Sequence, residues 1–386
     1  MTSSHPLPFR LALRRFGAFR ILGTRRREPL LPRLVFMGGD PGECVDALRS
    51  IRSPEQWVAR WSALADERAA LGAECAARGD RRTAAETLRQ AVGYLRVAEY
   101  LETSPDARAD LWRRLVALAE RASAQDDAPW RRYEVPWEGL SIPLSVRTVP
   151  GEPEAPCVLT LGGVDGVKEE FHGISEAYLR RGWCTAALDL PGQGELRRLK
   201  DVRWRPDAEG VISALLDRLT RLPGVDPSRI AIVGGSAGGY FALRAAASDA
   251  RITACGLISV PISLLDVHRG APRPIPQTMR YNLGAATRAD AERELRRYDA
   301  TEHAGRVTCP VFQVHGGADT TVPIEHAHRV AGLVKGPVTG VFYDDGDHMC
   351  FNHRPDWEAK LRGWLGDVFS RGAAGERKVG HGEVPA

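Results

Sequence analysis

Paired cysteines, clustered metal ligands and long apolar runs are all missing from this 386-residue chain. Its seven cysteines are widely scattered, odd in number and free of any C-x-x-C pair, which argues against a disulfide framework and a zinc cluster. No apolar run approaches the length of a membrane span. We therefore expect reduced cysteines in a cytoplasmic protein, with no membrane partner, no metal and no cofactor.

A strong net charge is also missing, since 53 basic and 49 acidic side chains leave only +4 at pH 7. Residues 1–27 depart from this balance because they contain seven arginines and no acid. Such an arm can contact nucleic acid or anionic lipid, but a terminal segment is more often solvated and partly ordered. We favour the second reading and predict a partly ordered basic leader over residues 1–40, with no nucleic-acid partner. The segment "FGAFRILG" within it is too short, and too interrupted by Arg20, for a signal-peptide core.

Helical periodicity dominates residues 41–130, which we predict to be an N-terminal, all-helical domain. The stretch "SPEQWVARWSALADERAALGAECAARGD" begins with Ser53 as an N-cap and Pro54 at the first helical position. Trp57 and Trp61 start a series of apolar residues at helical spacing. Two further stretches repeat this pattern, and none of the three carries a catalytic motif.

The pattern changes after residue 130, where short apolar runs begin to alternate with amphipathic helices. The runs are "CVLTLGG", "WCTAALDL", "RIAIVGG", "ACGLISV", "PVFQVHG" and "TGVFYDDG". Runs that are apolar throughout are typical of parallel strands buried on both faces. The alternation predicts a doubly wound, mostly parallel α/β sheet over residues 131–370. Residues 371–386 are predicted to form a disordered tail.

One serine lies among four glycines in "IAIVGGSAGGYFALRAAAS", between a predicted strand and a predicted helix. Gly234 to Gly238 fit the pattern G-x-S-x-G in the strand–turn–helix context that the motif requires. Glycines are needed because the strained turn brings the strand and helix backbones together. A phosphate-binding loop is disfavoured, since neither nucleotide-binding glycine register is present, whereas a structural turn stays open. We interpret Ser236 as an exposed nucleophile.

A neutral serine needs a base, and the base needs an orienting acid. In α/β-hydrolases the three follow the chain order Ser, acid, His. Asp319 follows the predicted strand in "VFQVHGGADTTVP", and His348 follows the next in "VFYDDGDHMCFNH". Because the carboxyl ends of parallel strands meet at one edge, we predict that Ser236, Asp319 and His348 converge. The weaker rivals are His315, Asp344, Asp345 and Asp347.

Acyl-transfer chemistry also needs hydrogen-bond donors for the oxyanion that develops. One donor is the backbone N–H of Ala237, the residue after the nucleophile. We assign the second, in the loop "TLGGVDGVKEEF", to the N–H of Val164 or, failing that, of Gly163. Asp165 is the next residue, and two roles are open for it. It binds the substrate or shuttles a proton, or it caps a helix that begins near Lys168.

Five motifs that follow the helical region resemble α/β-hydrolases grouped around 2,6-dihydroxypseudooxynicotine hydrolase. They are "GGVDGVKEEF", "LDLPGQGE", "GGSAGGYFALRAA", "HGGADTTVP" and "GDHMCFN". Fermentation-respiration-switch-type proteins and fungal yellowish-green-type polyketide-shortening hydrolases look similar too. The resemblance implies a Ser-His-Asp enzyme whose N-terminal helices cap the active site, frequently as a homodimer. It also matches Asp165 to an acidic position where the C–C hydrolase is expected to have Glu.

We therefore expect a serine hydrolase that forms an acyl-enzyme and cleaves a small aromatic or polyketide-type substrate. The bond cleaved is a carbon–carbon bond next to a ketone, or an ester. Specificity should lie in the cap and in the segment that contains Arg273, Arg280 and Tyr281, although solvated surface is the commoner role of any one of them. Two alternatives stay open: an acyltransferase or cyclase of secondary metabolism on the same triad, and a non-catalytic binding protein with this fold.

Overall fold

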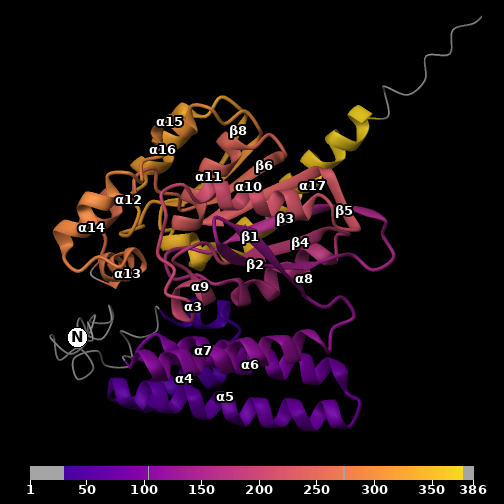
Figure 1. Cartoon of the computed structure of the whole chain (residues 1–386), viewed down its shortest axis with the longest axis vertical. Coiled ribbons are helices and arrows are strands. Elements are labelled where there is room, and N and C mark those ends of the chain that lie inside the picture. Colours follow the sequence, from indigo (N-terminus) through magenta and orange to yellow (C-terminus); the bar gives the residue numbers. More distant parts are fainter. Residues whose placement is uncertain (1–29, 103, 273, 377–386) are drawn as a thin grey trace, which may run out of the picture.

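The protein was analysed as a computed structural model that describes residues 30–102, 104–272 and 274–376. A layer of helices lies along one side of a larger α/β region (Figure 1). Most of the predicted basic leader, Arg273 and the last ten residues lie outside the described residues. Helix α17 (Arg354–Glu376) runs past residue 370, so residues 371–376 belong to a helix and not to the predicted tail.

Five helices form the described part of the N-terminal region, and the helix after Ser53 starts at Pro54, as the capping pattern predicts. They are α3 (Leu31–Phe36), α4 (Pro41–Ser50), α5 (Pro54–Ala77), α6 (Arg81–Glu99) and α7 (Pro105–Ser123). At α4, α5 and α7 the side chains of Asp40, Ser53 and Ser104 each accept a backbone N–H, and a proline follows. The apolar faces meet in one core around Trp61 and Trp112, both fully buried. This helical domain is therefore held together by its own core.

The end of the predicted leader belongs to this folded region. Leu34 of α3 is buried in the helical core. Phe36 contacts Phe171 and Phe351 of the α/β region edge-on, at centroid distances of 6.5 and 5.5 Å. Helix α3 thus packs against both parts of the molecule.

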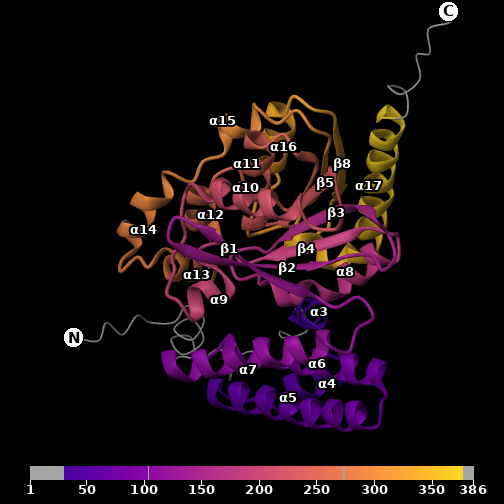
Figure 2. The same ribbon diagram turned by 45° about the vertical axis from the view of Figure 1, so that its right-hand side comes forward.

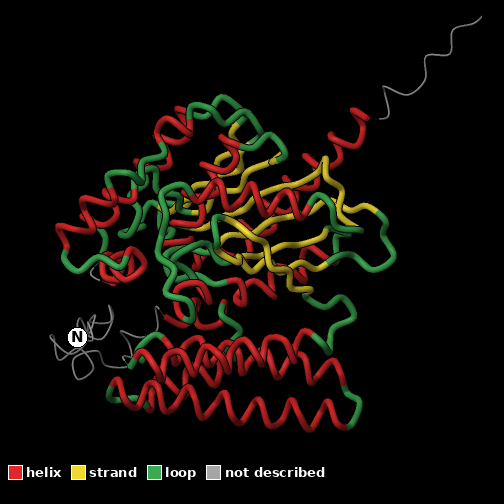
Figure 3. The backbone as a smooth tube through the Cα atoms, in the orientation of Figure 1, coloured by secondary structure: helices red, strands yellow, loops and turns green. Residues whose placement is uncertain are grey.

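The described residues form one eight-stranded sheet in the order β1-β2-β4-β3-β5-β6-β7-β8 (Figure 3). The strands are β1 (Arg131–Trp137), β2 (Leu140–Arg147), β3 (Glu154–Leu161), β4 (Cys184–Leu188), β5 (Gly224–Gly235), β6 (Ile252–Ile258), β7 (Val311–Gly316) and β8 (Val338–Tyr343). Strands β1 and β2 are antiparallel to their neighbours, and β4, β3, β5, β6, β7 and β8 pair in parallel. The predicted α/β-hydrolase fold, mostly parallel and preceded by helices, is confirmed.

Helices cover both faces of the sheet (Figure 2). They are η3 (Lys168–Phe171), α8 (His172–Leu179), α9 (Gly194–Arg198), α10 (Ala208–Leu219), α11 (Ala237–Ser248), α12 (Leu264–Gly270), α13 (Pro274–Leu283), α14 (Arg288–Leu295), α15 (Thr301–Ala304), α16 (Glu325–Leu333), η4 (His348–His353) and α17. No described helix has both the length and the apolar character needed to cross a membrane.

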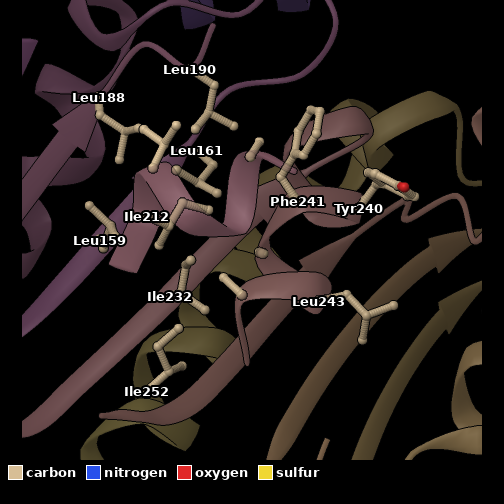
Figure 4. Packing of buried hydrophobic residues seen from close by; sticks show 14 of the residues in the cluster. Leu159, Leu161, Leu188, Leu190, Ile212, Ile232, Tyr240, Phe241, Leu243 and Ile252 are labelled. Atoms are coloured by element: carbon tan, nitrogen blue, oxygen red, sulfur yellow. The ribbon is translucent and has the colours of Figure 1, made fainter. Parts of the chain in front are cut away.

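Alternation along the central strands divides the core between the two faces. Ile232 of β5 packs with the residues of α10 and α11 that Figure 4 shows, including Ile212 and Phe241. Its neighbours Ala231 and Val233 join the opposite core, with residues of α8 and α17. Burial on both faces fixes strand β5, and with it the turn that carries Ser236.

Candidate active site

Ser236 lies on a strained turn between β5 and α11. Its backbone has φ 53° and ψ −125°, in a region that residues with a β-carbon rarely adopt. A β-carbon added to Gly238 would lie 2.5 Å from the carbonyl oxygen of Gly162, so only glycine fits there. Gly234 is restricted in the same way by the backbone of Gly238. The glycines therefore allow the serine to stand at the carboxyl edge of the sheet.

Three distant residues meet at this edge. Nε2 of His348 lies 3.1 Å from Oγ of Ser236, although the two residues are 112 positions apart. Nδ1 of the same ring lies 2.8 Å from Oδ2 of Asp319. The geometry suits a serine hydroxyl that donates to Nε2 and an Nδ1–H that donates to the carboxylate. The structure thus brings together the three residues that the sequence predicts.

The Asp319 carboxylate is fixed on both of its oxygens. Oδ2 accepts from His348, and Oδ1 accepts the backbone N–H groups of Thr321 and Val322, each at 2.8 Å. Burial alone would raise its pKa, but the hydrogen bonds from His348 and the two N–H groups hold the pKa below the usual value. Asp319 is therefore an ionised acid that sets the orientation of the imidazole.

Three of the four rival residues have partners of their own. His315 donates from Nε2 to the carbonyl of Val322 at 2.8 Å and is fully buried, as a structural histidine would be. Asp345 pairs with His353, and Asp347 caps η4 by accepting the N–H of Phe351.

Asp165 contacts the helical domain. Its Oδ2 accepts from the hydroxyl of Tyr100 at 2.9 Å, and Nη2 of Arg33 lies 3.5 Å from Oδ1. Burial opposes ionisation, but the charges of Arg33 and Arg96 lower the pKa of Asp165. The capping alternative is wrong, because η3 begins after Val167 and has no side-chain cap. The carboxylate instead joins the two domains, and its side chain keeps 35% of its surface exposed.

We predict that one oxyanion donor is the N–H of Ala237 and that the second comes from Val164 or Gly163. Ala237 is the first residue of α11, so its N–H has no acceptor within the helix. A β-carbon added to Gly163 would lie 3.9 Å from Oγ of Ser236. Val164, our first choice, is one residue further along, and its carbonyl accepts from Asn282. Gly163 thus lies next to the serine, and the second donor stays a prediction: the N–H of Val164 or, failing that, of Gly163.

Two buried carboxamides, which the sequence did not point out, hold this loop. Nε2 of Gln193 donates to the carbonyls of Gly162 and Gly163 at 2.9 and 2.6 Å, and Nδ2 of Asn282 donates to that of Val164 at 2.6 Å. In a trans peptide the N–H points away from the C=O. The N–H groups of Gly163 and Val164 are therefore turned away from Gln193. Gln193 lies in the quoted motif "LDLPGQGE", which was the available signal.

Two cavities flank the loop. A small one of about 60 Å³ is lined by Gly163, Gly235 and Met349, next to the serine. A larger one of about 210 Å³ lies between the helical domain and α13, and Asp165 and Tyr281 line it. Arg33 lines both cavities. Residues 30–102, 104–272 and 274–376 contain no group of three or more His, Cys, Asp or Glu that could hold a metal ion.

This chain matches a peptidase family and relatives that are named as hydrolases. Residues 206–372 match the prolyl oligopeptidase family. The chain is 30% identical to 2,6-dihydropseudooxynicotine hydrolase of Paenarthrobacter nicotinovorans, over 82% of this chain and 85% of that protein. It is 35% identical to 20-hydroxy-prefusarin hydrolase FUS2 of Gibberella moniliformis, over 66% of this chain and 62% of that protein. The chain thus spans less than two thirds of this fungal relative.

A solved structure agrees with the first of these relatives. The crystal structure of 2,6-dihydroxy-pseudo-oxynicotine hydrolase superposes with a TM-score of 0.81 at 30% identity, covering 88% of this chain and 96% of that chain. AbyA5, at 21% identity and a TM-score of 0.68, shares the fold.

Proposed function

Since this chain belongs to the α/β-hydrolase family that includes 2,6-dihydropseudooxynicotine hydrolase, we propose that it is a serine hydrolase whose nucleophile is Ser236. The observation that carries the proposal is the continuous hydrogen-bond chain from Asp319 through His348 to Ser236. A binding protein that had lost catalysis would have no need to keep a strained serine in contact with an oriented base.

The reaction proceeds through an acyl-enzyme. As Oγ of Ser236 bonds to the carbonyl carbon, Nε2 of His348 takes the hydroxyl proton and Asp319 stabilises the imidazolium. The N–H of Ala237 and that of Val164 or Gly163 bind the oxyanion. When the tetrahedral intermediate collapses, the leaving group takes the proton from His348. A water molecule, deprotonated by the same ring, then releases the acid and restores the serine.

We assign two kinds of leaving group to this site. In ester cleavage an alkoxide leaves, and in cleavage next to a ketone a carbanion leaves that is stabilised as its enolate. The second needs a polar group near the departing carbon, and Asp165 occupies the loop position two residues from Gly163. The C–C reaction is therefore our main proposal, with ester cleavage as its simpler form.

Fluorophosphonate labelling of the wild-type protein tests the proposal. We expect one stable adduct, located by peptide mass mapping on the segment that contains Ser236. Reaction of a panel of 1,3-diketones and esters in heavy-oxygen water should place one label in the acid product. An unlabelled product, formed as an intramolecular ester, would identify a cyclase instead. A folded wild-type protein that takes up no fluorophosphonate would contradict the proposal.

The glutamine that holds the oxyanion loop should affect turnover more than binding. We expect Gln193→Leu to lower kcat by about a hundredfold with little change in KM. The oxyanion donor acts only in the transition state, and this variant misplaces it. Gln313→Leu is the matched control. Gln313 is equally buried and its Nε2 donates to the carbonyl of Ala327, away from the nucleophile. If both variants lose the same fraction of kcat, the effect is general destabilisation and the positioning role is refuted.

Removing the charge of Asp165 should change substrate preference. Asp165→Asn keeps the shape of the side chain but removes its negative charge and its ability to accept a proton. We expect the ratio of kcat/KM for a 1,3-diketone to that for an ester to fall by about tenfold, with thermal unfolding little changed. An equal loss on both substrates would show that Asp165 only joins the domains.

A further inference from the structure

A charged cluster at the domain boundary has too few carboxylates for its guanidinium groups. Oε1 of Glu99 accepts from Nε of both Arg108 and Arg198, at 2.5 and 3.0 Å, and its Oε2 accepts from Nη1 of Arg96 at 2.7 Å. Arg96 has a second carboxylate, Glu170, at 2.8 Å. Arg108 and Arg198 therefore share a single negative charge between them.

Burial makes this imbalance costly. The side chains of Glu99, Arg108 and Arg198 are 1%, 9% and 3% exposed. Burial would raise the pKa of Glu99, but the three guanidinium groups hold that pKa well below the usual range. Among the described residues, with Arg33 and Asp165 included, four arginines in this cluster face three carboxylates. A buried positive charge without a full counter-charge is stabilised by another anion.

The outer ends of the two arginines remain available. Both arginines bind Glu99 through Nε. Their terminal nitrogens are therefore left to bind another carboxylate in a bidentate manner. Nη1 of Arg108 is buried without a hydrogen-bond partner, and Glu99 is the only side chain in the described part of the chain that accepts from Arg198. Both arginines line the 210 Å³ cavity.

The rest of the cavity wall suits an apolar body with one charged end. Trp57 and Ile275 line it, and the ring of Tyr281 lies over the guanidinium of Arg108, with Cζ 4.9 Å from the ring centroid. Asp165 lines the same cavity and is at most about 7 Å along the chain from Gly163. A small molecule bound to the arginines can therefore reach the loop that flanks the nucleophile.

We propose that this cavity anchors the substrate through an anionic oxygen group of the substrate, which the terminal nitrogens of Arg108 and Arg198 bind. This group is a carboxylate or an ionised enol or phenol, all of which present oxygen lone pairs to a guanidinium. It is distinct from the oxyanion of the tetrahedral intermediate. This assignment rests on the proposed function, because it names the substrate class of the same site. Of the residues that the sequence analysis named for specificity, Tyr281 lines this cavity, whereas Arg280 donates to the carbonyl of Ala286.

Two 4-nitrophenyl esters that differ only in charge test the assignment on turnover. They are the mono-4-nitrophenyl ester of glutaric acid and its methyl ester. We expect the wild type to prefer the anion by about tenfold or more in kcat/KM, and Arg198→Gln to remove that preference while retaining the neutral ester. Arg198→Lys should restore part of it. Arg89→Gln, which changes an arginine of α6 paired with Asp126, should leave the preference intact. Equal losses on both esters in Arg198→Gln would overturn the proposal.

Binding to a catalytically dead protein separates this proposal from that of the hydrolase. In Ser236→Ala we expect monomethyl glutarate or the ionised enol of 1,3-cyclohexanedione to bind by calorimetry, and dimethyl glutarate to bind at least about tenfold more weakly. Whichever anion binds identifies the type of anionic oxygen group. If neither anion binds better than the neutral diester, the subsite is refuted even when the wild type is labelled by fluorophosphonate. If an anion binds but no labelling occurs, the subsite stands and the hydrolase proposal fails.

Discussion

Replacing either Ser236 or His348 with alanine should lower kcat by about a millionfold, and replacing both should lower it no further. The reason is that Oγ and Nε2, 3.1 Å apart, act as one unit in which each atom is ineffective without the other. The remaining rate would come from the oxyanion donors and substrate binding alone. Initial rates on the preferred substrate for the two single variants and the double variant measure this.

His353→Ala provides the control for the histidine. His353 ends the same 3-10 helix that His348 begins, but it pairs with Asp345. We expect this variant to keep kcat within about threefold of the wild type. If the double variant instead loses the product of the two single losses, Ser236 and His348 work independently and the proposed proton transfer is wrong.

Asp319→Asn should lower kcat by about ten thousandfold while leaving the protein folded. The amide oxygen can still accept the N–H groups of Thr321 and Val322, so the loop keeps its shape. The amide NH₂ then faces Nδ1 of His348 and favours the tautomer in which Nε2 carries the proton. That tautomer cannot take a proton from the serine. Kinetics, together with thermal unfolding, would show a loss of activity without a loss of structure.

Asp345→Asn is the matched control for this acid, because Asp345 lies on the loop of His348 but pairs with another histidine. We expect near-normal turnover for it. If Asp319→Asn retained at least a tenth of the wild-type rate while Asp345→Asn lost most of it, the wrong carboxylate would have been assigned.

Strand-to-loop boundaries explain how much of the site the sequence could predict. Ser236, Asp319 and His348 each follow an apolar run, and parallel strands bring such loops to one edge whatever the details of packing. Gly163 and Val164 are neighbours whose N–H groups both turn away from Gln193, so the choice between them depends on fine backbone orientation. Spacing along the chain does not contain that information.

Contacts between the domains were also hard to predict, because spacing along the chain does not show which distant residues meet. Asp165 follows a predicted strand and precedes a helix, so a local cap was a reasonable alternative. Its partners Tyr100 and Arg33 lie 65 and 132 positions away in the helical domain. No periodicity relates them, and the same holds for the pairing of Glu99 with Arg198, which are 99 positions apart. Such pairings are set by how the two domains dock.

The ionic boundary has a consequence for how the finished molecule assembles. Apolar surfaces can pack in several relative positions, whereas buried charged groups are stable only in the arrangement that pairs each with an opposite charge. The pairing of Arg96 with Glu170, at 2.8 Å, is one such contact that fixes how the two halves of the molecule are seated. The helical domain supplies Trp57, Tyr100 and Arg108 to the wall of the 210 Å³ cavity, so that wall is complete only when the two domains have docked.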